Sequence, residues 1–260
     1  MRPRVFAAFP SLENAGPMPP SRPFLIVETG QPVPTMRRHR GFPHWIRTAA
    51  GLAADEVEAV DVEAGAALPP HGAYAGILVT GSGAMVTERR DWSERTAGWL
   101  RGAAHEGAAI FGICYGHQLL AHALGGRVGD NPNGREMGTV PVAMLPAAAD
   151  DPLFAGLPQP FAAQATHLQA VLEMPAEAVL LATTDLDPCH AFRWRDRAWG
   201  VQFHPEFSGT HMRGYVHARR DALAREGTDP VRVLREVRAA PHARRVMRRF
   251  VRHARRLPTG

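Results

Sequence analysis

The pattern of apolar and polar positions alternates between short buried strands and helices over the first half of the chain. Strands are predicted from apolar runs at residues 23–27, 57–62, 75–80 and 108–113. Helices are predicted from the spacing of apolar residues at 44–52, 91–106 and 116–124, the last of which ends at two glycines. A chain that alternates strand and helix in this order folds into a parallel sheet with helices on both faces.

In the second half of the chain, the predicted strands follow one another without helices between them. Strands are predicted at 139–145, 161–166, 179–183, 191–194 and 199–204, and residues 209–257 are mostly helical in pattern. Short turns between the later strands favour antiparallel pairs at one side of the sheet. We therefore expect an α/β domain over residues 23–218. A Pro-rich flexible tail at 1–22 precedes it, and an Arg-rich helical extension at 219–260 is expected to pack on or beside it.

The apolar content and its distribution indicate a globular protein rather than a membrane-spanning or secreted one. The apolar fraction of 45% over 260 residues is enough for a continuous core. Because no uncharged apolar stretch reaches about 18 residues, a membrane-spanning segment is not expected. The first 23 residues lack the apolar centre of a signal peptide, which predicts a cytoplasmic location.

Arginine supplies every fixed positive side chain, because the chain has no lysine, and its net charge is +5. Arginine pairs gather after residue 212, at 219–220, 244–245, 248–249 and 255–256. These helices present either a solvated basic face or a docking surface for an acidic partner. Because no nucleic-acid-binding motif accompanies the charge, a nucleic-acid partner is not expected.

Two cysteines, Cys114 and Cys189, are too few for a disulfide framework and lack the paired spacing of a zinc site. Neither a metal nor a cofactor is predicted, since the Gly81-Ser82-Gly83 turn also lacks the lysine and serine of a phosphate-binding loop. Cys189 is expected to pack at the start of a strand. Cys114 requires a different interpretation.

Cys114 lies where a predicted strand passes directly into a helix, with glycine at positions 112 and 116. Such a turn forces its central residue into a strained backbone and lifts the side chain clear of the sheet. The N-terminal end of a helix also favours a thiolate, because its unpaired N–H groups stabilise negative charge. These features predict a nucleophilic cysteine.

A cysteine nucleophile needs a base, and the base needs an acceptor that orients it. His204 and Glu206 end an apolar strand that would run parallel beside the strand of Cys114. Side chains two positions apart on an extended backbone point the same way, so that Glu206 would hold the ring of His204 toward the thiol. The sequence therefore predicts a catalytic triad of Cys114, His204 and Glu206.

The segments 112–118 (GICYGHQ) and 200–207 (GVQFHPEF) together resemble the class I glutamine amidotransferases. The resemblance spans roughly 23–218. It implies a flavodoxin-like three-layer sandwich with a central, mostly parallel sheet, and hydrolysis of the glutamine side-chain amide through a cysteine thioester to glutamate and ammonia. Within the family, the segment 133–138, Thr166-His167 and Val171 are most similar to the glutaminase domain of GMP synthases.

The family's other site residues can be carried over by position. The resemblance implies oxyanion donors at the backbone N–H groups of Ser82 and Tyr115, although Ser82 and Gly83 replace a glycine and a proline of the usual family loop. The implied substrate-binding residues are Gln118, Gly81, Thr166 and His167. From the residues alone, helix capping remains an alternative for the Gln118 amide, and His167 is equally a locally bonded loop histidine. Arg135 and Glu136 would border the site or pair with each other.

About 50 residues follow Glu206, too few for the ATP-using synthetase that GMP synthase joins to its glutaminase. The ammonia would then pass to a separate synthetase partner. Alternatively, the chain is a free-standing hydrolase of glutamine or γ-glutamyl peptides. A third interpretation is a catalytically silent domain that binds a partner through its arginine-rich helices.

Overall fold

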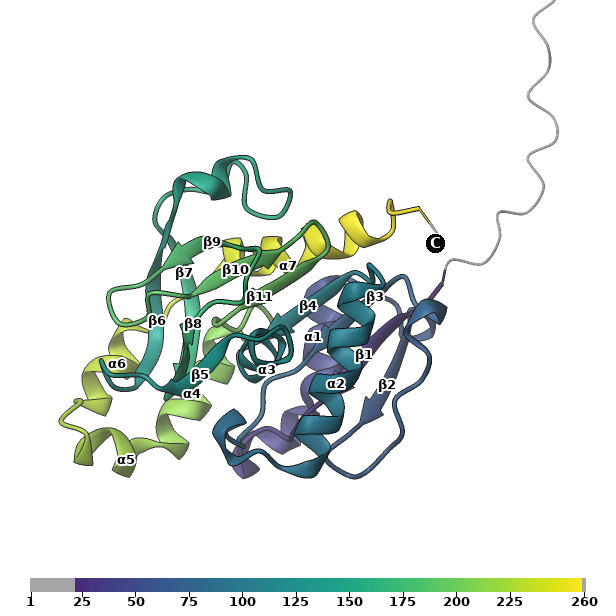
Figure 1. Ribbon diagram of the computed structural model, residues 1–260. Coiled ribbons are helices and arrows are strands. Elements are labelled where there is room, and N and C mark those ends of the chain that lie inside the picture. Colours follow the sequence, from purple (N-terminus) through teal and green to yellow (C-terminus); the bar gives the residue numbers. More distant parts are fainter. Residues whose placement is uncertain (1–21, 259–260) are drawn as a thin grey trace, which may run out of the picture.

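The computed structural model describes residues 22–258 of the protein, and a nine-stranded sheet runs through it (Figure 1). Residues 1–21 of the predicted tail lie outside the described residues. In spatial order, the parallel half of the sheet consists of β2 (Val57–Asp61), β1 (Phe24–Glu28), β3 (Gly76–Val79), β4 (Ile110–Ile113) and β11 (Ala198–Val201). This order is that of flavodoxin-like folds, in which ligands bind at the carboxyl ends of the strands.

Antiparallel strands extend the sheet beyond β11, as the short turns predicted. They follow in the order β10 (Ala191–Trp194), β9 (Ala178–Thr183), β6 (Glu136–Met144) and β7 (Phe161–His167). A separate two-stranded sheet, β5 (Arg127–Asp130) with β8 (Gln169–Glu173), was not predicted. Its strands are short, and β5 contains a glycine and has no fully buried position, so neither periodicity nor β propensity marks it.

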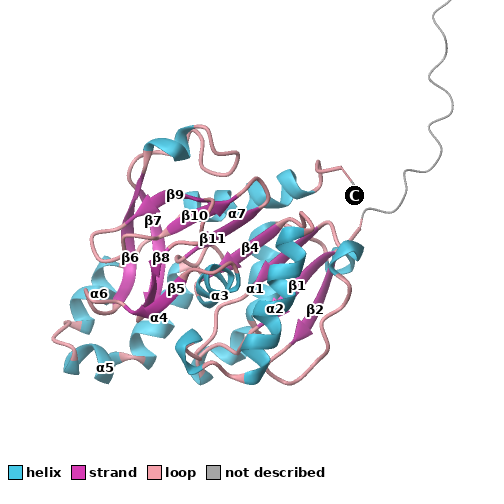
Figure 2. Ribbon diagram, viewed as in Figure 1, coloured by secondary structure: helices cyan, strands magenta, loops and turns pink. Residues whose placement is uncertain are grey.

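Two helical layers cover the sheet, one on each face (Figure 2). Helices α1 (Phe42–Ala50) and α7 (Pro241–Ala254) share a core with Phe24 and Ile26 of β1. Helices α2 (Asp91–His105) and α3 (Tyr115–Ala123) share the opposite core with Leu25 and Val27. Side chains alternate along β1 and contact both helical layers, which explains why its first four residues are all apolar.

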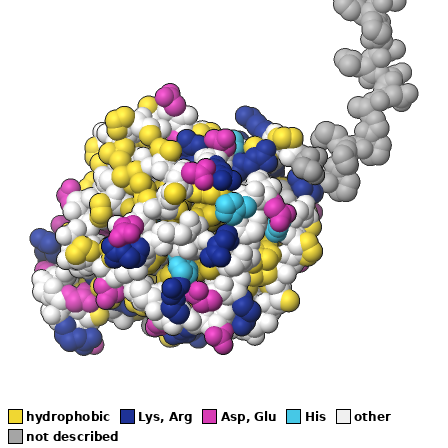
Figure 3. Space-filling model, in the orientation of Figure 1, with side chains coloured by type: hydrophobic (Ala, Val, Ile, Leu, Met, Phe, Trp, Pro, Cys, Tyr) yellow, Lys and Arg dark blue, Asp and Glu magenta, His cyan; other side chains and the backbone are white. Residues whose placement is uncertain are grey.

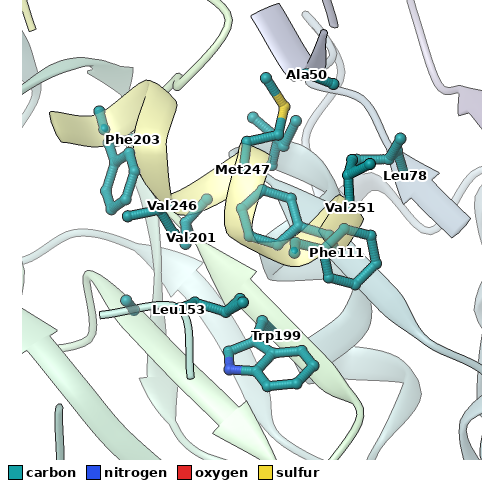
Figure 4. Close-up of a cluster of buried hydrophobic side chains, with 14 of the residues drawn as sticks. Ala50, Leu78, Phe111, Leu153, Trp199, Val201, Phe203, Val246, Met247 and Val251 are labelled. Carbon is teal, nitrogen blue, oxygen red and sulfur yellow. The ribbon is translucent and has the colours of Figure 1, made fainter. Parts of the chain in front are cut away.

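Helix α7, from the arginine-rich C-terminal region, is part of the main core. Its residues Val246, Met247 and Phe250 have no exposed surface and pack with sheet residues that include Phe111 and Trp199 (Figure 4). The helix is strongly amphipathic, with arginines on the side away from the sheet. Its apolar stripe, rather than its charge, attaches it to the domain.

The arginines of α7 are only in part a free basic face. Arg248 donates from Nε to the carbonyl of Ala49 at 3.0 Å, and Arg249 donates from Nη1 to the carbonyl of Leu153 at 3.0 Å. On the face shown in Figure 3, arginine side chains are interspersed with acidic ones. Arg248 and Arg249 therefore help to attach the helix to its neighbours, whether the basic face is solvated or binds an acidic partner.

The remaining helices lie between the last parallel strand and α7. They are α4 (Gly209–Ala218), α5 (Arg220–Arg225) and α6 (Pro230–Glu236). Met212 and Val216 of α4 pack in a third cluster with Phe42, Trp45 and Phe207. Within the described residues, no helix is both long and apolar enough to cross a membrane.

Candidate active site

The turn between β4 and α3 holds Cys114 in a strained backbone conformation, with φ 51° and ψ −101°. Glycine is required on both sides because the backbones approach closely. A Cβ on Gly112 would lie 2.4 Å from the carbonyl oxygen of Gly116, and a Cβ on Gly116 would lie 2.6 Å from that of Val79. The strain that the flanking glycines predicted is therefore present, and such strain is common at functional residues.

His204 lies beside this turn because β11 runs parallel to β4, with Val201 in register with Ile113. The backbone N–H of His204 donates to the carbonyl of Gln164 at 2.7 Å, which fixes the chain just after the strand. Its ring Nδ1 lies 2.7 Å from Oε1 of Glu206, and both side chains are buried. The ring also stacks on Phe207, with centroids 4.1 Å apart. His204 is thus held in one orientation.

The electrostatics of the site favour a charged histidine. Burial by itself lowers the pKa of His204, but the negative charges of Glu206 and of the Cys114 thiolate outweigh it and raise the pKa to about 10. The hydrogen bond to Glu206 occupies Nδ1, which leaves Nε2 as the nitrogen that can exchange a proton with sulfur. Near neutral pH, His204 can therefore carry a proton on both ring nitrogens.

The loop after β3 closes the site from the other side. A Cβ on Gly81 would lie 3.1 Å from Cε1 of His204 and 3.8 Å from Cβ of Cys114, so a small residue is needed there. Ser82 lines the same cavity as Cys114, and its Oγ accepts from the N–H of Ala84 at 3.0 Å. Tyr115 is the first residue of α3, and its N–H belongs to the first helical turn, which has no intrahelical acceptors. Both predicted oxyanion donors thus belong to the segments that flank Cys114.

Two cavities meet at Cys114. The larger has a volume of about 230 Å³ and reaches His204, Tyr215 and Arg37. The smaller lies toward Tyr115, Gln118 and Arg135, and Arg219 borders both. Among the described residues, three arginines and no aspartate or glutamate line these cavities. The site is therefore suited to an anionic rather than a cationic ligand.

Arg219 is a cavity-lining residue that the sequence prediction did not assign to the site. Its Nε is buried without a hydrogen-bond partner, while Arg135 forms a two-point ion pair with Glu226 at 2.8 and 3.0 Å. Burial and the charge of Arg135 lower the pKa of Arg219 from its usual range. Nothing in its sequence context distinguishes it, because it is one of many arginines in the region.

The predicted substrate residues have different environments. The carbonyl oxygen of Thr166 lies 3.8 Å from Sγ of Cys114, and Thr166 lines both cavities. Gln118 is buried, and its Nε2 donates to the carbonyl of Gln169 at 2.7 Å and to Oε1 of Gln202 at 3.0 Å. Its amide nitrogen is therefore occupied inside the protein, although Gln118 borders the smaller cavity.

His167 borders the smaller cavity through its segment, but its ring nitrogens point into the protein. Nδ1 lies 2.9 Å from the carbonyl oxygen of Gln169, and Nε2 lies 3.0 Å from Oε2 of Glu136. The alternative that Arg135 and Glu136 pair with each other is wrong, because Arg135 pairs with Glu226, whereas Glu136 lies against His167 and His190. Cys189 is buried just before β10, as expected for a structural cysteine.

A cysteine at a strained strand-to-helix turn, beside a buried histidine and glutamate on a flavodoxin-like sheet, is an arrangement suited to hydrolysis through a thiol. Sequence comparison identifies the family. Residues 41–220 match the family described as glutamine amidotransferase class-I, and the chain belongs to this family.

The curated relatives of this chain carry names of different activities. The GMP synthase [glutamine-hydrolyzing] of Aeropyrum pernix is 37% identical over 161 residues, which cover 62% of this chain and 29% of that protein. The γ-glutamyl-L-1-hydroxyisopropylamide hydrolase of a Pseudomonas species is 30% identical over 166 residues, covering 61% of this chain and 56% of that protein. The chain thus spans less than a third of the GMP synthase and about half of the hydrolase.

The fold also matches solved structures. A glutamine amidotransferase from Thermotoga maritima superimposes with a TM-score of 0.71 at 19% identity, covering 91% of this chain and 99% of that one. A glutamine amidotransferase from Methylobacillus flagellatus gives a TM-score of 0.68 at 19% identity, covering 89% and 94%. At these identities the likeness concerns the fold.

Proposed function

We propose that the protein hydrolyses the side-chain amide of glutamine through a γ-glutamyl thioester on Cys114, releasing glutamate and ammonia. The observation that carries the proposal is the buried His204–Glu206 pair, held at 2.7 Å, with His204 lining the cavity of the strained Cys114. Membership in the class I family supports the same chemistry. No cofactor is needed for it, because thiol, base and oxyanion donors all come from the chain.

In this mechanism the thiolate of Cys114 attacks the amide carbonyl carbon, and the oxygen becomes an oxyanion. The backbone N–H groups of Ser82 and Tyr115 would stabilise it, and such preorganised donors typically contribute ~10²–10³ in rate. The Nε2 proton of His204 passes to the departing ammonia. His204 then takes a proton from water, which hydrolyses the thioester, while Glu206 stays ionised and holds the ring.

Substrate recognition in this proposal depends on the arginines around Cys114. The α-carboxylate of the γ-glutamyl group is the charge that Arg219 would bind, since its guanidinium has a buried, unpaired Nε at the border of both cavities. Thr166 and Gly81 would form the walls beside the reacting carbonyl. Gln118 and His167 would support this wall from inside the protein rather than touch the substrate.

A second candidate function is hydrolysis of γ-glutamyl amides with a larger leaving group. The cavity of about 230 Å³ beside Cys114 reaches Arg37 and Tyr215, and a larger leaving group would lie in this part of it. The relatives with γ-glutamyl substrates in their names, including γ-glutamyl peptidase 5 of Arabidopsis thaliana, match over about half of their own length. In this case no synthetase partner would be involved, whereas a glutaminase would deliver ammonia to a separate synthetase.

One assay distinguishes these functions from a catalytically silent domain. Purified protein is given glutamine, γ-glutamylethylamide or γ-glutamyl dipeptides, with and without cell extract, and glutamate release is measured. Glutamine turnover stimulated by extract indicates an amidotransferase that works with a partner, and a higher kcat/KM for a substituted amide indicates a free-standing hydrolase. Cys114→Ala is the inactive control and Cys189→Ala the matched active one. Turnover of no substrate under any condition would indicate a silent domain.

A further inference from the structure

Four buried titratable side chains converge outside the active site. Glu136 begins β6, His167 ends β7, and Asp187 and His190 lie in the segment before β10. Their side chains are between 0% and 4% exposed. The spacing along the sequence gave no sign of this cluster, because its members are up to 54 residues apart and meet only through antiparallel strand pairing.

The distances within the cluster are short. Oε2 of Glu136 lies 3.0 Å from Nε2 of His167 and 2.9 Å from Nε2 of His190. The three ligand atoms lie within 4.8 Å of one another. Oδ2 of Asp187 lies 3.8 Å from Nε2 of His167 and is buried without a hydrogen-bond partner.

Burial is the first reason to expect a further component. Buried carboxylates need bonding partners, yet Oδ2 of Asp187 has no hydrogen-bond partner among the described residues. The two imidazole rings beside these carboxylates lie with their centroids 5.9 Å apart. One divalent cation between the ligand atoms would bind both carboxylates and both histidines.

The protonation of His167 is the second reason. Its Nδ1 faces the carbonyl oxygen of Gln169 at 2.9 Å and must therefore carry a hydrogen. In the neutral ring, Nε2 is then a lone pair that points at the carboxylate of Glu136. A metal-bound histidine typically donates its other ring N–H to a carbonyl in this way. Nδ1 of His190 is buried without a partner in either case, so the argument rests on His167.

We propose that Glu136, His167 and His190, with Asp187 as the fourth ligand, form a structural site for a divalent transition-metal ion, zinc above all. Two imidazoles with two carboxylates are a ligand set for zinc, and a closed, four-coordinate site is structural rather than catalytic. Bonds of about 2.0–2.2 Å imply ligand separations of roughly 3.3–3.6 Å, so Oε2 of Glu136 would move about half an ångström away from both histidine nitrogens, and Asp187 would move closer to the other ligands.

The site would brace one wall of the active-site cavity. His167 directly follows Thr166, whose carbonyl oxygen lies 3.8 Å from the sulfur of Cys114. The carbonyl of Gln169, which accepts from His167, also accepts from Gln118 at 2.7 Å. Metal binding would thus stiffen this wall without touching the reacting atoms.

The test is metal binding in the full chain carrying Cys114→Ala, because a thiol beside His204 is itself a possible metal ligand. Chelator-treated protein is titrated with Co²⁺, whose visible absorption reports tetrahedral coordination, and then with competing Zn²⁺. We expect one ion per chain, displaced by one Zn²⁺. His190→Phe and the isosteric Asp187→Asn should weaken binding at least ~100-fold, since even the loss of a supporting outer residue costs 10–100-fold.

The matched control is His122→Phe, which removes a half-buried histidine that also lies against a glutamate, Glu94, at 3.1 Å. It should leave Co²⁺ affinity and stoichiometry unchanged. Circular dichroism checks that each variant is folded, and Asp187→Asn serves if His190→Phe is not. Absence of stoichiometric binding in the folded parent, or equal affinity in parent and Asp187→Asn, would overturn the proposal and leave a buried ion pair. These results are independent of glutamine hydrolysis.

Discussion

Replacing Glu206 with glutamine tests the electrostatic role of the buried pair, because the substitution removes the charge but keeps an oxygen beside Nδ1 of His204. In the folded wild type the carboxylate, together with Cys114, raises the pKa of His204 to about 10. At a charge separation of about 4 Å and an effective dielectric constant of ~20, an ion pair is worth about 4 kcal/mol. That energy corresponds to roughly 3 pKa units, so the pKa of His204 should fall to about 7 in the variant.

The direction of the pH dependence follows from this change. Because the folded pKa of His204 exceeds its ordinary value of 6.5, the imidazolium contributes stability that is complete below pH 6.5 and lost as the pH rises through about 10. Activity that needs the imidazolium should fall over the same range. In Glu206→Gln the alkaline decline of kcat/KM should therefore move from about pH 10 to about pH 7, while the two proteins should differ least below pH 6.

The assay is kcat/KM for glutamine across pH 5.5–10, with the rate of Cys114 alkylation by iodoacetamide measured in parallel. Cys189 provides an internal reference, because burial and Asp187 raise the pKa of its thiol and keep it unreactive. Glu94→Gln, which removes the partner of the more exposed His122, is the control and should leave both profiles unchanged. An alkaline decline at the same pH in wild type and Glu206→Gln would refute the ion-pair account.

Three further substitutions have distinct expected outcomes. Gly112→Ala should destabilise the protein by at least about 2 kcal/mol in urea unfolding, because its Cβ would lie 2.4 Å from the carbonyl oxygen of Gly116; unchanged stability would contradict the reported close approach. Burial and Asp61 raise the pKa of Glu28 to about 7 against an ordinary 4.5, so its stability contribution is complete below pH 4.5 and lost as the pH rises through 7. Glu28→Gln should therefore gain ~1–3 kcal/mol over wild type at pH 8 and nothing at pH 4, whereas an equal gain at both would argue against the shift. Arg219→Gln should raise KM for glutamine about 10-fold or more with a smaller change in kcat, unlike exposed Arg220→Gln, and equal effects of both would remove Arg219 from substrate binding.

The fold could be predicted from the sequence where one periodicity dominates. Strand β1 begins with four apolar residues and β4, just before Cys114, has no polar side chain, because both faces of the parallel sheet are covered. The short β5–β8 pair escaped prediction because tertiary contacts, rather than local preference, create it. The role of α7 in the core was similarly hidden, since its arginines dominate the composition of the helix.

The site was predictable where chemistry and backbone geometry coincide in one segment. Cys114 between glycines, and His204 two residues before Glu206, carry their signals locally. Arg219 carries none, because its significance comes from lacking a partner at the border of two cavities. His167 was assigned to the substrate site from its position in the sequence. In the structure, its ring lies against the carboxylate of Glu136 in a buried cluster. Such pairings depend on strand register, which local patterns do not specify.

The central claim is that Cys114 is the nucleophile that forms a γ-glutamyl thioester, and active-site labelling tests it most directly. The protein is incubated with a diazo-ketone analogue of glutamine, and the adduct is located by intact mass and peptide mapping. The account predicts one adduct per chain, on Cys114, slowed by glutamine and absent in Cys114→Ala. A label on Cys189, or undiminished glutamine hydrolysis in Cys114→Ala, would contradict it.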